Sequence, residues 1–195
     1  LRIMRRTLIN QISKRCDKSK EIITGVVHAL LSRSIFIKYL EERKDSNGET
    51  VFPQDFYCNF MESAKWYTDV LNSKEATYNL FLTLKDKFNG DTLQVSEIET
   101  EIITQDDLDE LRTFILGNSE LESRQLTLWP LYSFDIIPIQ LISSIYELFF
   151  HLSDEEDEKG TYYTPLHLVN LVMDEVYPWA GEYKDISFFD PSCGS

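Results

Sequence analysis

The sequence has few cysteines, no long apolar run and no secretory signal. Its three cysteines, Cys16, Cys58 and Cys193, lie far apart without the spacing of metal ligands. This excludes a small disulfide scaffold and favours structural thiols in a reducing compartment. No stretch approaches the roughly 20 apolar residues of a membrane span, and no apolar segment with a cleavage site follows the basic start. We therefore expect a soluble, cytoplasmic protein without a membrane segment.

Basic residues are also scarce: 19 Lys and Arg face 33 Asp and Glu, which gives a net charge of −14. A surface that neutralises many phosphates should be rich in Lys and Arg, so the composition argues against an extended nucleic-acid-binding surface. The charge is uneven, however. The first 20 residues hold seven Lys or Arg and one Asp, whereas residues 154–158 are all acidic. The basic segment is either a solvated helix face or a DNA contact of a larger protein, and the acidic run is typical of a solvated loop.

Apolar residues are plentiful, at 43% of 195 residues, which is enough for the core of one domain or slightly more. Their spacing predicts helices over residues 21–43, 75–88 and 106–116, a helix that starts at Pro138 and ends before the acidic run, and a helix from Pro165 that Tyr177 and Pro178 stop. Turn and cap signals support these bounds, namely Gly48, Asn89 with Gly90, Thr104, Gly117 with Asn118, and Thr164.

The helical spacing also predicts which side chains face the core. For residues 21–43 they are Ile22, Ile23, Val26, Val27, Leu30, Leu31, Phe36, Ile37 and Leu40. For residues 75–88 they are Tyr78, Phe81, Leu82, Leu84 and Phe88. For the helix from Pro165 they are Leu168, Val169, Val172 and Val176.

Near residue 151 the sequence changes from all-helical to helix, loop and strand. Residues 186–189 are short and apolar and predict a strand buried on both faces. We therefore predict a mainly α chain with two domains, a helical domain over residues 1–150 and the start of an α/β domain over residues 151–195.

Two short segments stand out for their chemistry. Residues 160–165 read Gly-Thr-Tyr-Tyr-Thr-Pro, and residues 189–195 read Phe-Asp-Pro-Ser-Cys-Gly-Ser. A buried strand that ends in an acidic residue and a small-residue turn is how an open α/β sheet forms a nucleotide-sized crevice. Gly194 allows a ligand to approach the backbone closely.

Together, the two segments resemble the N6-adenine-specific DNA methyltransferases of restriction–modification systems. That family has a Gly-x-Tyr-Tyr-Thr-Pro segment before a helix and an Asp-Pro-x-Cys-Gly-Ser-Gly turn after the first strand. Residues 31–43 and 136–147 are similar to the helical region that precedes the catalytic domain in large methylases and fused restriction–methylation enzymes. The resemblance implies that residues 151–195 begin a Rossmann-like methyltransferase domain.

The resemblance also implies S-adenosylmethionine as the cofactor and assigns residues to it. Thr164 would lie near the methionine carboxylate, and Asp190 would help to hold the methionine and ribose portion. Ser192 stands where alanine is commoner in the family. The implied cofactor-binding residues are Tyr162, Tyr163, Thr164, Pro165, Asp190, Pro191, Ser192, Cys193 and Gly194.

No catalytic residue can be assigned, because the family's Asn/Asp-Pro-Pro-Tyr/Phe loop is missing: none of the six prolines is adjacent to another. The sequence does not begin with Met and stops inside the second motif. We therefore expect a fragment, inactive alone, of an enzyme that methylates adenine in DNA for restriction–modification or phage defence. The complete protein would bind double-stranded DNA and could work with a specificity subunit, a nuclease subunit or a fused nuclease domain.

The alternative is a non-enzymatic helical module for protein interaction. In that interpretation Tyr162 and Tyr163 pack under a helix and Asp190 is an ordinary turn residue. Cys193 has no histidine close in sequence and is not expected to be a nucleophile. No pair of histidines has the spacing of a metal site, so no metal is predicted.

Overall fold

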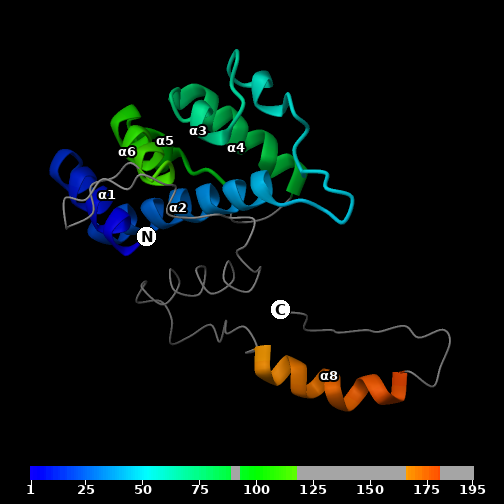
Figure 1. Ribbon diagram of the computed structural model, residues 1–195. Coiled ribbons are helices and arrows are strands. Elements are labelled where there is room, and N and C mark those ends of the chain that lie inside the picture. The colour runs from blue at the N-terminus through cyan, green and yellow to red at the C-terminus, as the bar shows by residue number, and fades with distance from the viewer. Residues whose placement is uncertain (89–92, 118–165, 181–195) are drawn as a thin grey trace. The chain divides into compact units, whose positions relative to one another are not determined.

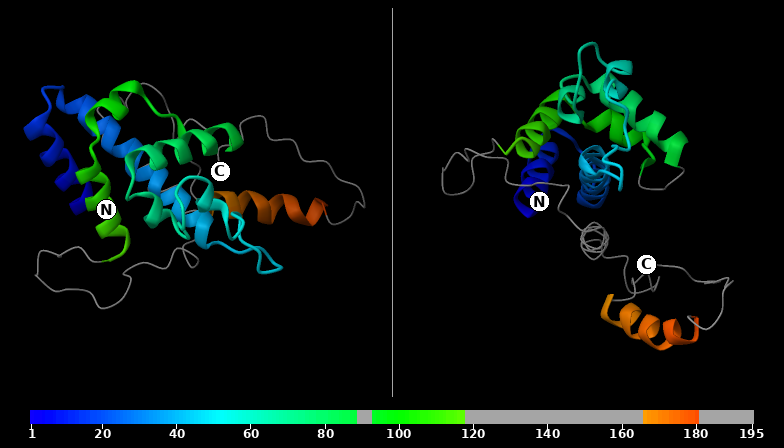
Figure 2. Two further views of the ribbon diagram at one scale, coloured as in Figure 1. Left: turned by 90° about the horizontal axis from the view of Figure 1, so that it is seen from above. Right: turned by 45° about the vertical axis from the view of Figure 1, so that its right-hand side comes forward.

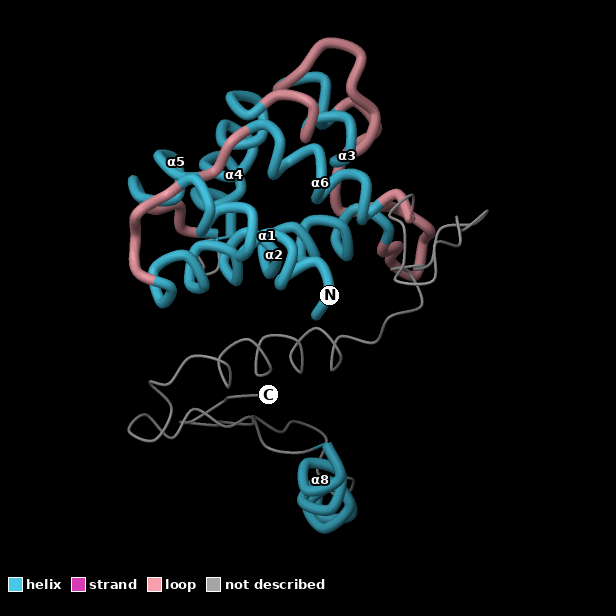
Figure 3. Tube along the Cα trace, turned by 90° about the vertical axis from the view of Figure 1, so that its left-hand side faces the viewer, coloured by secondary structure: helices cyan, strands magenta, loops and turns pink. Residues whose placement is uncertain are grey.

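The computed structural model describes residues 1–88, 93–117 and 166–180. The chain divides into two compact units, Leu1–Ile137 and Pro138–Ser195, and each is described by itself. Across the described ranges every regular element is a helix, apart from an isolated antiparallel bridge between Lys44 and Thr50 (Figure 3). The prediction of a mainly helical chain is confirmed for this part. The predicted domain boundary, the helix from Pro138 and the strand over residues 186–189 lie outside it.

The described helices, in chain order, are α1 (Arg2–Arg15), α2 (Lys20–Glu42), the 3-10 helix η1 (Phe56–Asn59), α3 (Tyr67–Val70), α4 (Lys74–Phe88), α5 (Glu97–Ile102), α6 (Gln105–Ile115) and α8 (Leu166–Ala180). The predicted helices over residues 21–43, 75–88 and 106–116 correspond to α2, α4 and α6. No separate helix was predicted at the positions of α1, α3 and α5.

The central helix of the first unit is α2, which contacts α1 and α3, while α1 also contacts α6 (Figures 1 and 2). Five of its apolar side chains are at most 1% exposed, namely Ile23, Val27, Leu30, Leu31 and Ile37. By length and composition α2 could cross a membrane, but 67% of its apolar window is buried inside the unit. Burial of this kind is typical of the core helix of a folded domain.

Polar side chains fix the ends of these helices. The Ser19 hydroxyl accepts a hydrogen bond from the Ile22 amide, 3.3 Å away, at the start of α2. At the start of α6, the Asp107 carboxylate accepts one from the Thr104 amide at 2.8 Å, which forms the predicted cap. Gly48 has a positive φ of 82°, so the predicted break after α2 is a turn that favours glycine.

Several predicted core positions are wrong. Ile22 is 40% exposed, because it lies in the first turn of α2, where fewer neighbours surround the helix. Leu82 is 48% exposed, because one residue beyond the buried Phe81 turns about 100° around α4. Phe88, the last residue of α4, is 37% exposed. The core face of α4 instead includes Thr77, which donates a hydrogen bond to the Val70 carbonyl at 3.0 Å.

The helix predicted from Pro165 is present as α8, but two predictions about it are wrong. It continues through Tyr177 and Pro178 to Ala180, so the proline lies in the last turn of the helix and does not end it. Its predicted core stripe is not buried: Leu168, Val172 and Val176 are 43%, 58% and 42% exposed. Helical spacing fixes which residues share a face, but a face is buried only where another element packs on it.

Candidate functional site

The nine predicted cofactor-binding residues, at positions 162–165 and 190–194, all lie outside the described residues. What the structure does describe is α8, which begins at Leu166, directly after the first motif. The free N–H groups and the positive dipole end of a helix start favour an anion. A carboxylate beside Thr164 would therefore meet favourable electrostatics.

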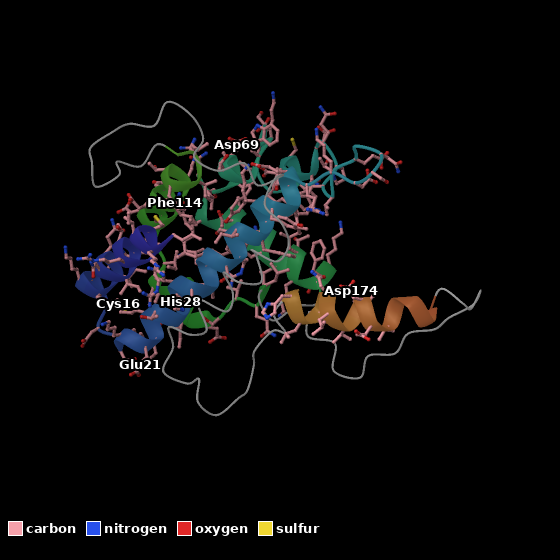
Figure 4. The ribbon with its side chains drawn as sticks, turned by 60° about the horizontal axis from the view of Figure 1, so that its bottom comes forward. Cys16, Glu21, His28, Asp69, Phe114 and Asp174 are labelled. Carbon is pink, nitrogen blue, oxygen red and sulfur yellow. The ribbon has the colours of Figure 1, made fainter. Side chains whose placement is uncertain are left out.

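α8 has two unlike faces in the described part. Leu168, Leu171, Val172, Met173 and Val176 are large apolar side chains, each between 42% and 58% exposed. Polar residues, including His167, Asn170 and Asp174, follow the other side, and Figure 4 labels Asp174 on this helix. A contiguous exposed apolar face of this kind marks a surface on which another element or molecule packs.

Among the described residues of the first unit, Arg33 at the middle of α2 is the largest fully buried side chain. Its guanidinium binds both oxygens of Glu99 on α5, with Nη1–Oε1 and Nη2–Oε2 distances of 2.6 and 3.2 Å. It also donates to the Gln94 carbonyl at 2.5 Å and lies 4.6 Å from the ring centre of Phe81. Arg33 is 0% and Glu99 1% exposed. The bidentate pair ties α5 to the centre of α2.

Two tyrosines complete this buried polar cluster. Tyr78 donates from its hydroxyl to Glu99 Oε1 at 3.3 Å, and Tyr67 shares a 2.8 Å hydrogen bond with the Ser34 hydroxyl. Burial raises the pKa of both phenols, so both stay protonated. They act as neutral hydrogen-bonding groups and not as acids or bases.

A second buried carboxylate, Glu41, holds the end of α2 against α3. It accepts hydrogen bonds from the Lys38 ammonium at 2.5 Å and from the Tyr67 amide at 2.6 Å. Tyr67 is the first residue of α3, and the first N–H groups of a helix have no acceptor inside the helix, so Glu41 supplies the missing partner. Glu41 therefore has a structural role in joining two helices.

The third buried carboxylate is Asp107 on α6, which is fully buried. It pairs with Arg15 and caps α6 through Thr104, and Arg15 also donates to the Ile102 carbonyl at 3.1 Å. An open hollow of about 570 Å³ lies beside this contact, lined by residues that include Arg15, Lys18 and Glu101. Arg15 pairs with Asp107, and Lys18 lies 3.5 Å from Glu101, so both cations that line the hollow already have an acidic partner.

Sequence reasoning missed these buried charges, although one signal pointed to them. Arg33 lies three residues after Leu30 and four before Ile37, on the apolar side of α2, where a cation needs a buried partner. The sequence could not identify Glu99 as that partner, because it lies 66 residues away.

His28 on α2 is buried and accepts a 2.5 Å hydrogen bond from Arg5 on α1 (Figure 4). Burial, together with the positive charge of Arg5, lowers the pKa of His28 to about 4. It is neutral at physiological pH. Among the described residues no group of three or more His, Cys, Asp or Glu side chains is placed to hold a metal ion, and Cys16 and Cys58 are free thiols.

Comparison with known proteins gives no relative: no family model, no curated protein and no solved structure matches this chain.

Proposed function

We propose that this chain is the helical region and the first cofactor-binding segment of an S-adenosylmethionine-dependent, adenine-specific DNA methyltransferase. The observation that carries the proposal is the ordered pair of sequence motifs at residues 160–165 and 190–195. The position of α8, which begins directly after the first motif, supports it. In the family that the motifs resemble, a single helix and a short connection separate the two segments.

In this proposal the cofactor supplies the methyl group, and the chain's own residues bind and orient it. Thr164 and the start of α8 receive the carboxylate, since helix-terminal N–H groups and the dipole favour an anion. Asp190 and the turn to Gly194 receive the ribose and methionine portion. The acceptor is the amino group of an adenine flipped out of the duplex. This chain lacks the loop that would polarise that amino group, so we propose that it transfers no methyl group by itself.

Cytoplasmic location, a role in restriction–modification or phage defence, and a specificity or nuclease partner belong to the same proposal. They depend on the motif pair alone. The competing function, a helical interaction module, has one supporting observation, the exposed apolar face of α8. A cofactor-binding experiment separates the two.

The test is calorimetric titration of S-adenosylmethionine into the chain extended through the coding sequence that follows residue 195. We expect saturable binding that Asp190→Ala abolishes. The matched control is Asp174→Ala, which removes an exposed carboxylate on α8 between the two motifs. Absence of binding, equal loss in both variants, or a following sequence without an Asn/Asp-Pro-Pro-aromatic loop would overturn the proposal. The 195-residue chain alone should bind weakly or undetectably.

A further inference from the structure

The outer side of α1 carries a regular row of polar and basic side chains. Positions 2, 6, 10 and 14 are four residues apart, so they follow one ridge of the helix in steps of about 6 Å. The row consists of Arg2, Arg6, Asn10 and Lys14, and all four side chains are exposed. We call these four residues the α1 row.

The basic residues of α1 fall into two groups with different environments. Arg5 and Arg15 have internal partners: Arg5 donates to His28, and Arg15 pairs with Asp107. Within the part of the chain that the structure describes, Arg2, Arg6 and Lys14 form no ion pair. The first group fixes α1 to its neighbours, and the second is left for solvent or a ligand.

The charge of α1 contrasts with that of the whole chain. α1 contains five Lys or Arg and no Asp or Glu, although the chain carries 33 acidic residues and a net charge of −14. Charges farther apart than about 10 Å are largely screened at 0.1 M salt. The row is therefore locally cationic even in an acidic protein.

A membrane surface does not fit this helix. Interfacial helices insert their apolar face between lipids, but four of the five large apolar side chains of α1 are at most 8% exposed, namely Met4, Leu8, Ile9 and Ile12, and Ile3 alone is exposed. A protein partner fits less well than a nucleic acid, because the core of a protein interface is depleted in charged residues and enriched in apolar and aromatic ones, which the α1 row lacks. The α1 row offers cations and an amide, which are the groups that contact phosphate oxygens.

We propose that the α1 row binds the phosphate backbone of a DNA duplex. The choice of DNA rests on the proposed methyltransferase function, whereas the phosphate chemistry rests on the row itself. Arg2, Arg6 and Lys14 each neutralise a phosphate, and Asn10 donates a hydrogen bond between them. The contact carries no base sequence information and positions the helical unit on the duplex.

The experiment measures fluorescence polarisation of a labelled DNA duplex with the full chain, over a range of NaCl concentrations. Each phosphate neutralised contributes about −0.9 to the slope of log Kobs against log salt concentration. We expect a slope of about −2.7 for the wild type, from three contacts. The variant Arg2→Gln/Arg6→Gln/Lys14→Gln should lose most of this slope and bind more than tenfold more weakly at low salt.

The control makes the same change in net charge elsewhere. It replaces three exposed lysines of the first unit that form no ion pair within the described ranges, as Lys44→Gln/Lys65→Gln/Lys85→Gln. We expect this control to keep the wild-type slope. Glutamine is a good helix former, and circular dichroism will verify that both triple variants stay folded.

The inference is overturned by no duplex binding by the wild type, by equal slopes for the α1 variant and the wild type, or by equal losses in the two triple variants. Binding to phosphatidylserine vesicles without duplex binding would overturn it in favour of a membrane contact. Duplex binding needs no cofactor. If the α1 variant and the wild type bind the duplex equally while the extended chain binds S-adenosylmethionine, this inference alone is refuted. If the α1 variant loses duplex binding while the extended chain binds no S-adenosylmethionine, the proposed function alone is refuted.

Discussion

Two apolar helices of this chain, α2 and α8, have opposite environments. α2 buries most of its leucines and isoleucines and also His28, Arg33 and Glu41, whereas Leu168, Leu171, Val172 and Val176 of α8 are exposed. The apolar pattern is helical in both. The difference shows that a helix's own sequence fixes its faces, while its neighbours decide which groups leave water. Buried polar and charged groups are tolerated in α2 because α1, α3 and α5 supply hydrogen-bond partners.

The largest effect should come from removing the charge at the centre of α2. Arg33→Met leaves Glu99 buried without its partner, and such a loss costs about 3–5 kcal/mol of unfolding free energy. Urea denaturation measures it. On α8, Asp174→Ala should change stability by less than about 0.5 kcal/mol, because the residue is exposed. The double variant Arg33→Met/Glu99→Leu should recover most of the loss, and a cost below about 1 kcal/mol for the single change would contradict a buried pair.

A matched pair of leucines tests the contrast in packing. Leu30 on α2 is fully buried and Leu171 on α8 is 58% exposed. Leu30→Ala should cost about 2–5 kcal/mol, since it removes apolar contacts and leaves a cavity. Leu171→Ala should stay within about 0.5 kcal/mol. Equal costs in urea denaturation would mean that the two helices are equally buried.

The third difference between α2 and α8 is the pH dependence of stability, which we expect from His28 on α2. Its pKa falls from the ordinary 6.5 to about 4 in the folded state, so the unfolded chain binds the proton more readily. Stability from this residue is present above pH 6.5 and is lost as the pH falls toward 4, by on the order of 2–3 kcal/mol. His28→Gln keeps an acceptor for Arg5 and should flatten this part of the profile. His167→Gln, on exposed α8, should leave it unchanged, and thermal unfolding at pH 4–7 distinguishes them.

The smallest expected effect is an increase in stability. Gly25 is exposed in the interior of α2, with nothing within 4 Å of an added Cβ atom. Gly25→Ala should raise the unfolding free energy by about 0.5–1 kcal/mol, because alanine loses less backbone entropy in a helix. Gly48→Ala should instead destabilise the protein, since its φ of +82° is strained for alanine. A decrease in unfolding free energy for Gly25→Ala would show that neighbouring atoms leave no room for a Cβ atom at this position.

The sequence was a good guide to local structure. Helical spacing located α2, α4 and α6, and the cap at Thr104 and the turn at Gly48 were predicted from residue type. It was a poor guide to long-range contacts. Nothing near Arg33 in the sequence identifies Glu99, and nothing in the α8 pattern indicates what packs on its apolar side. The cofactor residues, including Thr164 and Asp190, lie outside the described residues, so that prediction still depends on the motifs.

The Arg33–Glu99 contact also constrains the order in which the first unit assembles. α1 and α2 are neighbours in sequence and can pair early, but Arg33 must keep its water until α5 arrives from 66 residues away. We therefore expect the middle of α2 to close only when α5 docks, after α1 and α2 have paired. Pulsed hydrogen exchange during refolding should protect the amide of Leu8 on α1 before that of Ile103, which donates to the Glu99 carbonyl at the end of α5, and simultaneous protection would mean that α5 docks as α1 and α2 pair.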